Sequence, residues 1–156
     1  MKQYLIDYFK YNDWANRRLI KAIKELPDKE RCLYFFSHLI TCHNKWINVF
    51  LKEWEDKGTA WFADVYPAEE LETRWNDCLT NWLNFLEAQT EDSLEKDVLY
   101  ESYQTKKKYL INVRKIAFQL NCHTIHHRGQ MVLIMRDMGI TPPATDYIYT
   151  AFKEVK

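Results

Sequence analysis

Apolar residues recur at steps of three and four along four long stretches of this chain, and that period is typical of amphipathic helices. The first stretch predicts a helix over about residues 4–25, which Pro27 ends. The second predicts a helix over about residues 28–54, with Asp28 as a suitable capping residue at its start. A loop is expected at 58–66, because its residues lack either helical or strand periodicity.

Two further helices are expected after this loop. The third covers about residues 67–88, with a proline and two glutamates in its first turn, where both residue types are favoured. The fourth covers about residues 111–138 and ends at Gly139, a suitable residue for a helix C-terminus. Between them, β-prone residues at 98–109 predict a short hairpin.

These elements predict an all-α fold, a four-helix bundle with a short hairpin-like insertion before the last long helix. The 156 residues are close to the usual size of one domain, so we expect a single domain over residues 1–156. The loop after the second helix is long enough to cross the bundle, and a simple up-down-up-down order is therefore not assumed.

Charge and composition narrow the classes of function. Twenty-two basic and twenty-two acidic side chains cancel, so the chain has no basic excess for binding nucleic acid. Its start carries Lys2 and Asp7 among apolar residues, unlike a signal peptide, and no apolar run is long enough to cross a membrane. We expect a cytoplasmic protein whose four scattered cysteines are free thiols.

The five histidines gather in two short stretches, which indicates a metal site. His123 and His127 are four residues apart on the apolar stripe of the fourth predicted helix, so both can face one ion from inside the bundle. A third histidine from the other stretch would complete three imidazoles with an open coordination position, as in catalytic centres. The competing interpretation is a pair of core histidines that are satisfied by other polar groups.

The other stretch contains His38 and His43, which are five residues apart and differ by about 140° around a helix. Only one of them can face the ion, and periodicity alone slightly favours His43. A rival structural site would combine His38 and Cys42 with Cys122 and His126. That site would place its ligands away from the apolar stripe of the fourth helix, so we rank it below the three-histidine site.

Missing motifs exclude several kinds of metal chemistry. The segment 123–127 lacks the glutamate of H-E-x-x-H zinc peptidases, and neither histidine stretch has the Glu-x-x-His of di-iron bundles. The C-x-x-C-H motif of c-type haem attachment is also absent. A mononuclear centre that activates a bound water or thiol remains.

Several segments resemble one known family. Residues 123–130 read H-T-I-H-H-R-G-Q, and residues 142–148 begin with P-P and continue to T-D-Y-I. Residues 11–16 read Y-N-D-W-A-N, and His38 stands eight residues before Trp46. Together these segments are similar to the damage-inducible DinB-like (DinB/YfiT) metalloenzymes over nearly the whole chain.

The resemblance implies a four-helix bundle, often a homodimer, with one divalent ion that is usually zinc or nickel. It implies His38, His123 and His127 as the ligands, so it replaces the preference for His43 and leaves His126 beside the site or on the surface. Characterised relatives are transferases or isomerases that use low-molecular-weight thiols such as bacillithiol, mycothiol or glutathione.

The leading hypothesis is a metal-dependent thiol S-transferase that acts on small electrophiles, with Trp14, Trp46 and Tyr147 lining the small-molecule pocket. A metal-dependent hydrolase and a non-catalytic metal-binding stress protein are the alternatives. Arg128 and Asp146 are expected either to pair across the site or to remain as separate surface charges.

Overall fold

The computed structural model of the protein describes residues 1–51, 64–102 and 104–152. Four long helices form the bundle: α1 (Lys2–Lys24), α2 (Glu30–Leu51), α3 (Leu71–Glu87) and α5 (Val113–Asp137). The prediction of a four-helix bundle is therefore confirmed. The predicted end of the second helix at residues 52–54, and most of the predicted loop at 58–66, lie outside the described residues.

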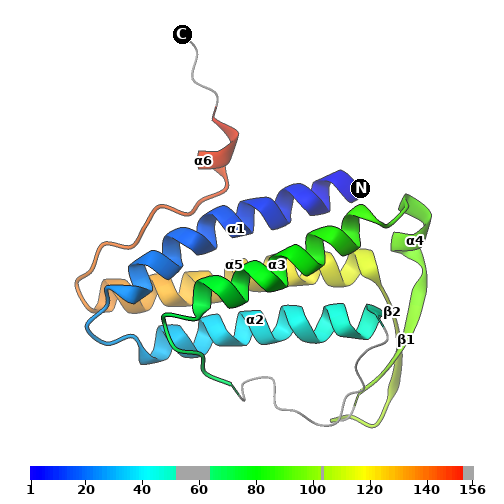
Figure 1. Cartoon of the computed structure of the whole chain (residues 1–156), viewed down its shortest axis with the longest axis horizontal. Coiled ribbons are helices and arrows are strands. Elements are labelled where there is room, and N and C mark those ends of the chain that lie inside the picture. The colour runs from blue at the N-terminus through cyan, green and yellow to red at the C-terminus, as the bar shows by residue number, and fades with distance from the viewer. Residues whose placement is uncertain (52–63, 103, 153–156) are drawn as a thin grey trace.

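Each long helix contacts two others: α1 packs against α3 and α5, and α2 packs against the same two. Figure 1 shows that α2 and α3 run in one direction along the bundle, whereas α1 and α5 run in the opposite direction. Parallel neighbours need a connection as long as the bundle. This arrangement agrees with the expectation that the bundle is not a simple up-down-up-down one.

The hairpin-like insertion is also confirmed. Strand β1 (Asp97–Glu101) pairs antiparallel with β2 (Lys108–Asn112), and Leu99 lies opposite Leu110. Two short helices, α4 (Glu91–Glu95) and α6 (Ile148–Ala151), were not predicted, because elements of four or five residues are too short to show a helical period. Figure 1 shows α6 on the outer side of α1.

Local signals fix both ends of α5. The strand β2 extends as far as Asn112, whose side chain accepts a hydrogen bond from the backbone N–H of Lys115 and caps the helix. At the other end Gly139 has a φ of 74°, and the N–H of Ile140 donates to the carbonyl of Met135. This is a Schellman motif, in which glycine is favoured because of its positive φ.

Two apolar clusters fill the bundle, one near each end. Trp75 belongs to the cluster formed by the end of α1 and the start of α2, and Trp82 belongs to the cluster at the opposite end. The bundle also buries polar side chains, among them His38 of α2 and His127 of α5. Among the described residues, no helix has the length and apolar character needed to cross a membrane.

Candidate metal centre

A compact group of nitrogen and sulfur atoms lies between α2 and α5. His38 and Cys42 are one turn apart on α2, and His123 comes from α5. The Nε2 atoms of His38 and His123 are 3.0 Å apart. The Sγ of Cys42 is 3.5 Å from Nε2 of His38 and 3.8 Å from Nε2 of His123. These three ligand atoms all lie within 4.8 Å of one another.

The ring of His127 lies beside this group. Its centroid is 4.9 Å from that of His38 and 4.4 Å from that of His123. Nδ1 of His127 is 2.6 Å from Oε1 of Gln130, one turn along α5, and the ring of Phe35 stacks on the imidazole at 5.4 Å. Because the amide oxygen accepts, Nδ1 carries the proton and Nε2 keeps its lone pair for a ligand.

Burial favours the neutral forms of His123 and His127. Loss of solvent, reinforced by the neighbouring imidazoles of His127 and His38, lowers the pKa of His123 to about 4. Loss of solvent also lowers the pKa of His127, although the hydrogen bond to Gln130 raises it in part. Burial raises the pKa of the Cys42 thiol to about 12. The imidazoles are thus in the unprotonated form that binds a metal ion.

The donor set fits a divalent transition ion. His38 and Cys42 are about 95% buried, so their nitrogen and sulfur atoms are shielded from water. Neutral imidazole and sulfur are ligands that zinc accepts readily, and imidazole also suits nickel. The residues present therefore agree with the predicted class of ion.

His43 lies on another side of α2. It is 1% exposed, its Nδ1 donates to the carbonyl of Leu39 at 2.8 Å, and its ring makes edge contacts with Phe9 and Trp75. The slight periodicity preference for His43 is therefore wrong. The middle of the apolar stripe of α2 faces the core, whereas the flank that carries His38 faces α5.

The rival set of His38, Cys42, Cys122 and His126 does not assemble. Cys122 and His126 are both exposed on α5, although the His126 ring is 5.0 Å from that of His127. Cys42 and His38 do lie together, but they meet His123. From the sequence, Cys42 was expected to be a ligand only in this rival set. Its spacing of four residues from His38 on one helix was the signal that both could face one ion.

The opposite face of α5 carries a second buried polar group around Arg128. Its Nη1 donates to the side-chain oxygens of Asn12 at 3.0 Å and Asn16 at 3.3 Å. Its Nη2 donates to the Tyr11 hydroxyl at 2.7 Å, and that hydroxyl donates to the carbonyl of Thr145 at 2.8 Å. A chain of hydrogen bonds therefore attaches the carboxyl-terminal segment to α5 through α1.

This network corrects both expectations for Arg128 and Asp146. Arg128 is 3% exposed, so it is not a surface charge, and Asp146 is exposed and makes no ion pair with it. Burial lowers the pKa of the Arg128 guanidinium, while Tyr11 and Asp146 oppose that shift. The carboxyl-terminal segment is attached to Arg128 through the Tyr11 hydroxyl and not through the Asp146 carboxylate. The Tyr11 side chain is held in place on a packed helix, whereas Asp146 lies on an exposed loop.

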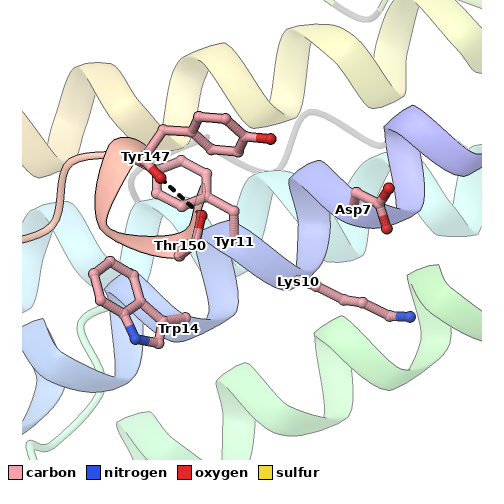
Figure 2. A pocket seen from close by; sticks show the side chains of 6 residues that line it. All are labelled: Asp7, Lys10, Tyr11, Trp14, Tyr147 and Thr150. Atoms are coloured by element: carbon pink, nitrogen blue, oxygen red, sulfur yellow. Dashed lines mark hydrogen bonds between the residues drawn. The ribbon is translucent and has the colours of Figure 1, made fainter. Parts of the chain in front are cut away.

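The three aromatic residues expected around the small-molecule pocket are not all together. Trp14 and Tyr147 line one cavity of about 340 Å³ between α1 and α6, as Figure 2 shows. Its described lining residues are Asp7, Lys10, Tyr11, Trp14, Tyr147 and Thr150, and none belongs to the histidine group. Trp46 instead packs against Tyr100 of β1, with ring centroids 5.2 Å apart.

Comparison with known proteins agrees with this arrangement. An uncharacterised protein of Bacillus subtilis (strain 168), YizA, is 20% identical over 161 residues, which cover 97% of this chain and 98% of that protein. The sequence pattern of the DinB family matches residues 1–155, so the match includes all four helices of the bundle and every residue of the histidine group. This chain belongs to the DinB family.

Proposed function

We propose that this chain is a divalent-metal-dependent enzyme that transfers a low-molecular-weight thiol to a small electrophile. The observation that carries the proposal is the group of His38, Cys42 and His123 between α2 and α5, with His127 beside it. His38, His123 and His127 are the proposed ligands of one zinc or nickel ion. The reaction is assigned to the cytoplasm, because thiols are kept reduced there.

When bound, the ion would supply Lewis acidity that lowers the pKa of a coordinated thiol and keeps it as the nucleophilic thiolate. The protein residues prepare this position. Gln130 fixes the tautomer of His127, and Phe35 covers one face of that ring. His123 is only half-buried, and its side of the group is the proposed route of approach for small molecules.

The contacts of Trp14, Trp46 and Tyr147 with the small molecules stay a prediction. Trp14 and Tyr147 line an aromatic cavity with Lys10 and Asp7 as charged groups, and none of its described lining residues belongs to the histidine group. Trp14→Ala is expected to raise the KM for the thiol and to leave the metal content unchanged. An unchanged KM would remove Trp14 from the proposed binding residues.

A second copy of the chain is the proposed partner of the outer face of α5. Phe118, Ile125 and Leu133 are exposed at helical spacing on that face. Gly129 lies among them, and a Cβ built on it would meet no atom within 4 Å, so no contact within the chain requires a glycine. Gly129→Leu is expected to give a monomer in sedimentation experiments, and an unchanged sedimentation coefficient would refute this interface.

One observation favours a second candidate function. Cys42 lies close enough to His38 and His123 to occupy a coordination position, and an ion from which Cys42 never dissociates, enclosed by protein ligands, would serve structure only. A non-catalytic metal-binding protein would contain the ion and conjugate no thiol.

The test uses protein purified without an affinity tag. Elemental analysis should give about one divalent ion per chain, and 1-chloro-2,4-dinitrobenzene with bacillithiol, mycothiol or glutathione should give a conjugate in mass spectrometry. His123→Ala should lose both the ion and the conjugation, whereas the neighbouring His126→Ala should keep both. An ion without conjugation by any thiol would support the structural candidate, and hydrolysis of an ester substrate in place of conjugation would indicate a hydrolase.

A further inference from the structure

We propose that Cys42 is itself a ligand of the ion, so that the centre combines imidazole nitrogens with a protein thiolate. This inference rests on the proposed metal centre and deepens it. His38 and Cys42 supply their atoms from successive turns of α2, and His123 supplies its Nε2 from the facing surface of α5.

The distances between the donor atoms support this assignment. Tetrahedral zinc sites with Zn–N of about 2.1 Å and Zn–S of about 2.3 Å place two nitrogens about 3.4 Å apart and a nitrogen and a sulfur about 3.6 Å apart. Here the two Nε2 atoms of His38 and His123 are 3.0 Å apart. The sulfur of Cys42 is 3.5 and 3.8 Å from them. All three edges match the ligand triangle of such a site within a few tenths of an ångström.

The other buried cysteines provide a comparison within the same chain. Cys32 and Cys78 belong to the apolar cluster at one end of the bundle, where a cysteine packs as a small hydrophobic residue. Cys42 is also buried and belongs to the apolar cluster at the other end of the bundle, but its sulfur lies within 4 Å of imidazole nitrogens from two different helices. These two imidazoles distinguish the surroundings of Cys42 from those of Cys32 and Cys78.

A thiol that only donates a weak hydrogen bond to one imidazole is the competing interpretation. The sulfur is 3.5 Å from Nε2 and 3.6 Å from Nδ1 of His38 and 3.8 Å from Nε2 of His123, so it does not point at a single acceptor. The 3.0 Å distance between the two Nε2 atoms allows one ring to donate a proton to the other, and a cation bound by all three atoms would take the place of that proton.

The assignment has a consequence for the proposed transferase. His38, Cys42 and His123 form the compact group, and together with the proposed ligand His127 they would make four protein ligands, the number in a closed zinc site. An external thiol then gains access only when Cys42 leaves or when the coordination number rises to five. Cys42→Ser is therefore expected to bind an external thiol more tightly than the wild-type protein does.

Cobalt substitution tests the ligand directly, because a thiolate bound to Co²⁺ gives a sulfur-to-metal charge-transfer band in the near ultraviolet that imidazole ligands do not give. Wild-type protein and the matched control Cys122→Ser are expected to show this band. Cys42→Ser is expected to lose it while it keeps the visible d–d bands of imidazole-bound cobalt. A band that persists in Cys42→Ser, or that is missing from cobalt-loaded wild-type protein, overturns the assignment.

Zinc-edge X-ray absorption on wild-type protein gives a second measurement that does not depend on the folding of a variant. One sulfur at about 2.3 Å from zinc supports the assignment, and a shell of nitrogen and oxygen alone overturns it. Failure of the metal centre is distinguishable from failure of the Cys42 ligand. If wild-type protein binds neither cobalt nor zinc, the proposed centre itself is wrong; if it binds them without sulfur, only the role of Cys42 is wrong.

Discussion

The two polar faces of α5 differ in how their groups are partnered. On the face toward α1, Arg128 supplies donors and meets the oxygens of Tyr11, Asn12 and Asn16. On the face toward α2, His123 meets other bases, the imidazole of His38 and the sulfur of Cys42. The first face pairs a cation with acceptors that the chain itself provides. The second brings together imidazole and sulfur groups that could hold a metal ion.

This difference separates a structural polar network from a binding site. Buried polar groups remain in proteins when they have partners, and a network with donors matched to acceptors needs nothing from outside. A buried group with an excess of lone pairs needs protons or a metal ion. The contrast therefore predicts that changes on one face act on folding, and that changes on the other face act on metal binding.

The largest effect is expected for Arg128→Met. The change leaves the oxygens of Asn12 and Asn16 buried without their donor, and each unsatisfied buried acceptor costs about 1–3 kcal/mol. Urea unfolding should show this loss in the free energy of unfolding. Zinc affinity measured under conditions where the variant is folded should match the wild type, and a specific loss of zinc binding would contradict the separation of the two faces.

The reverse result is expected for His123→Ala. Loss of a ligand should weaken zinc binding by more than about 100-fold, a larger loss than that caused by removing an outer hydrogen-bond partner. The free energy of unfolding of the metal-free protein should change little, because His123 is only half-buried. Calorimetric titration with zinc measures the first effect, and an equal weakening in His126→Ala would break the assignment of the α5 face.

A pH effect is expected from the core histidine on α2. Burial lowers the pKa of His43 to about 4 in the folded protein, whereas the unfolded chain titrates near 6.5. Between these values the unfolded state binds the additional proton, so stability is full above about pH 6.5 and falls as the pH drops toward 4. The free energy of unfolding should be about 2 kcal/mol lower at pH 5 than at pH 7 through this group.

His43→Leu removes this titration and provides its control. The variant should show a shallower loss of stability between pH 7 and pH 5 and should keep its zinc affinity, because the His43 ring faces Phe9 and Trp75. Denaturant titrations at the two pH values measure the change. If the variant has the wild-type slope, His43 is not the group that titrates.

The smallest effect is expected for Gln130→Ala, which removes the acceptor that orients His127. Removal of such an outer partner lowers metal affinity by about 10- to 100-fold. Gln119→Ala, at an exposed position on the same helix, is the matched control and should bind zinc like the wild type. Equal affinity in both variants would mean that His127 needs no fixed tautomer and would weaken its place among the ligands.

Much of the fold could be predicted because its signals are local. Helical periodicity located the four long helices, and Gly139 marked the end of α5 because its positive φ follows from the sequence nearby. The short helix α4 depends on a capping box between Thr90 and Ser93. The capping box covers only four residues, so it is a weaker signal for a helix than the long periodic stretches before and after it.

The site could be predicted only in part, because it depends on how two helices meet. The spacing of His123 and His127 is a property of one helix and could be read from the sequence. Choosing between His38 and His43 required the orientation of α2 against α5, and the resemblance to the family provided the choice. The approach of Cys42 to His123 across 81 residues has no local signal.

The Arg128 network has a consequence for the order in which the protein is made. The buried oxygens of Tyr11, Asn12 and Asn16 belong to α1, but their cationic donor is more than 110 residues later in the chain. Until α5 has been synthesised, α1 cannot bury that face without leaving acceptors unpaired. The packing of α1 is therefore expected to be completed only when α5 joins it.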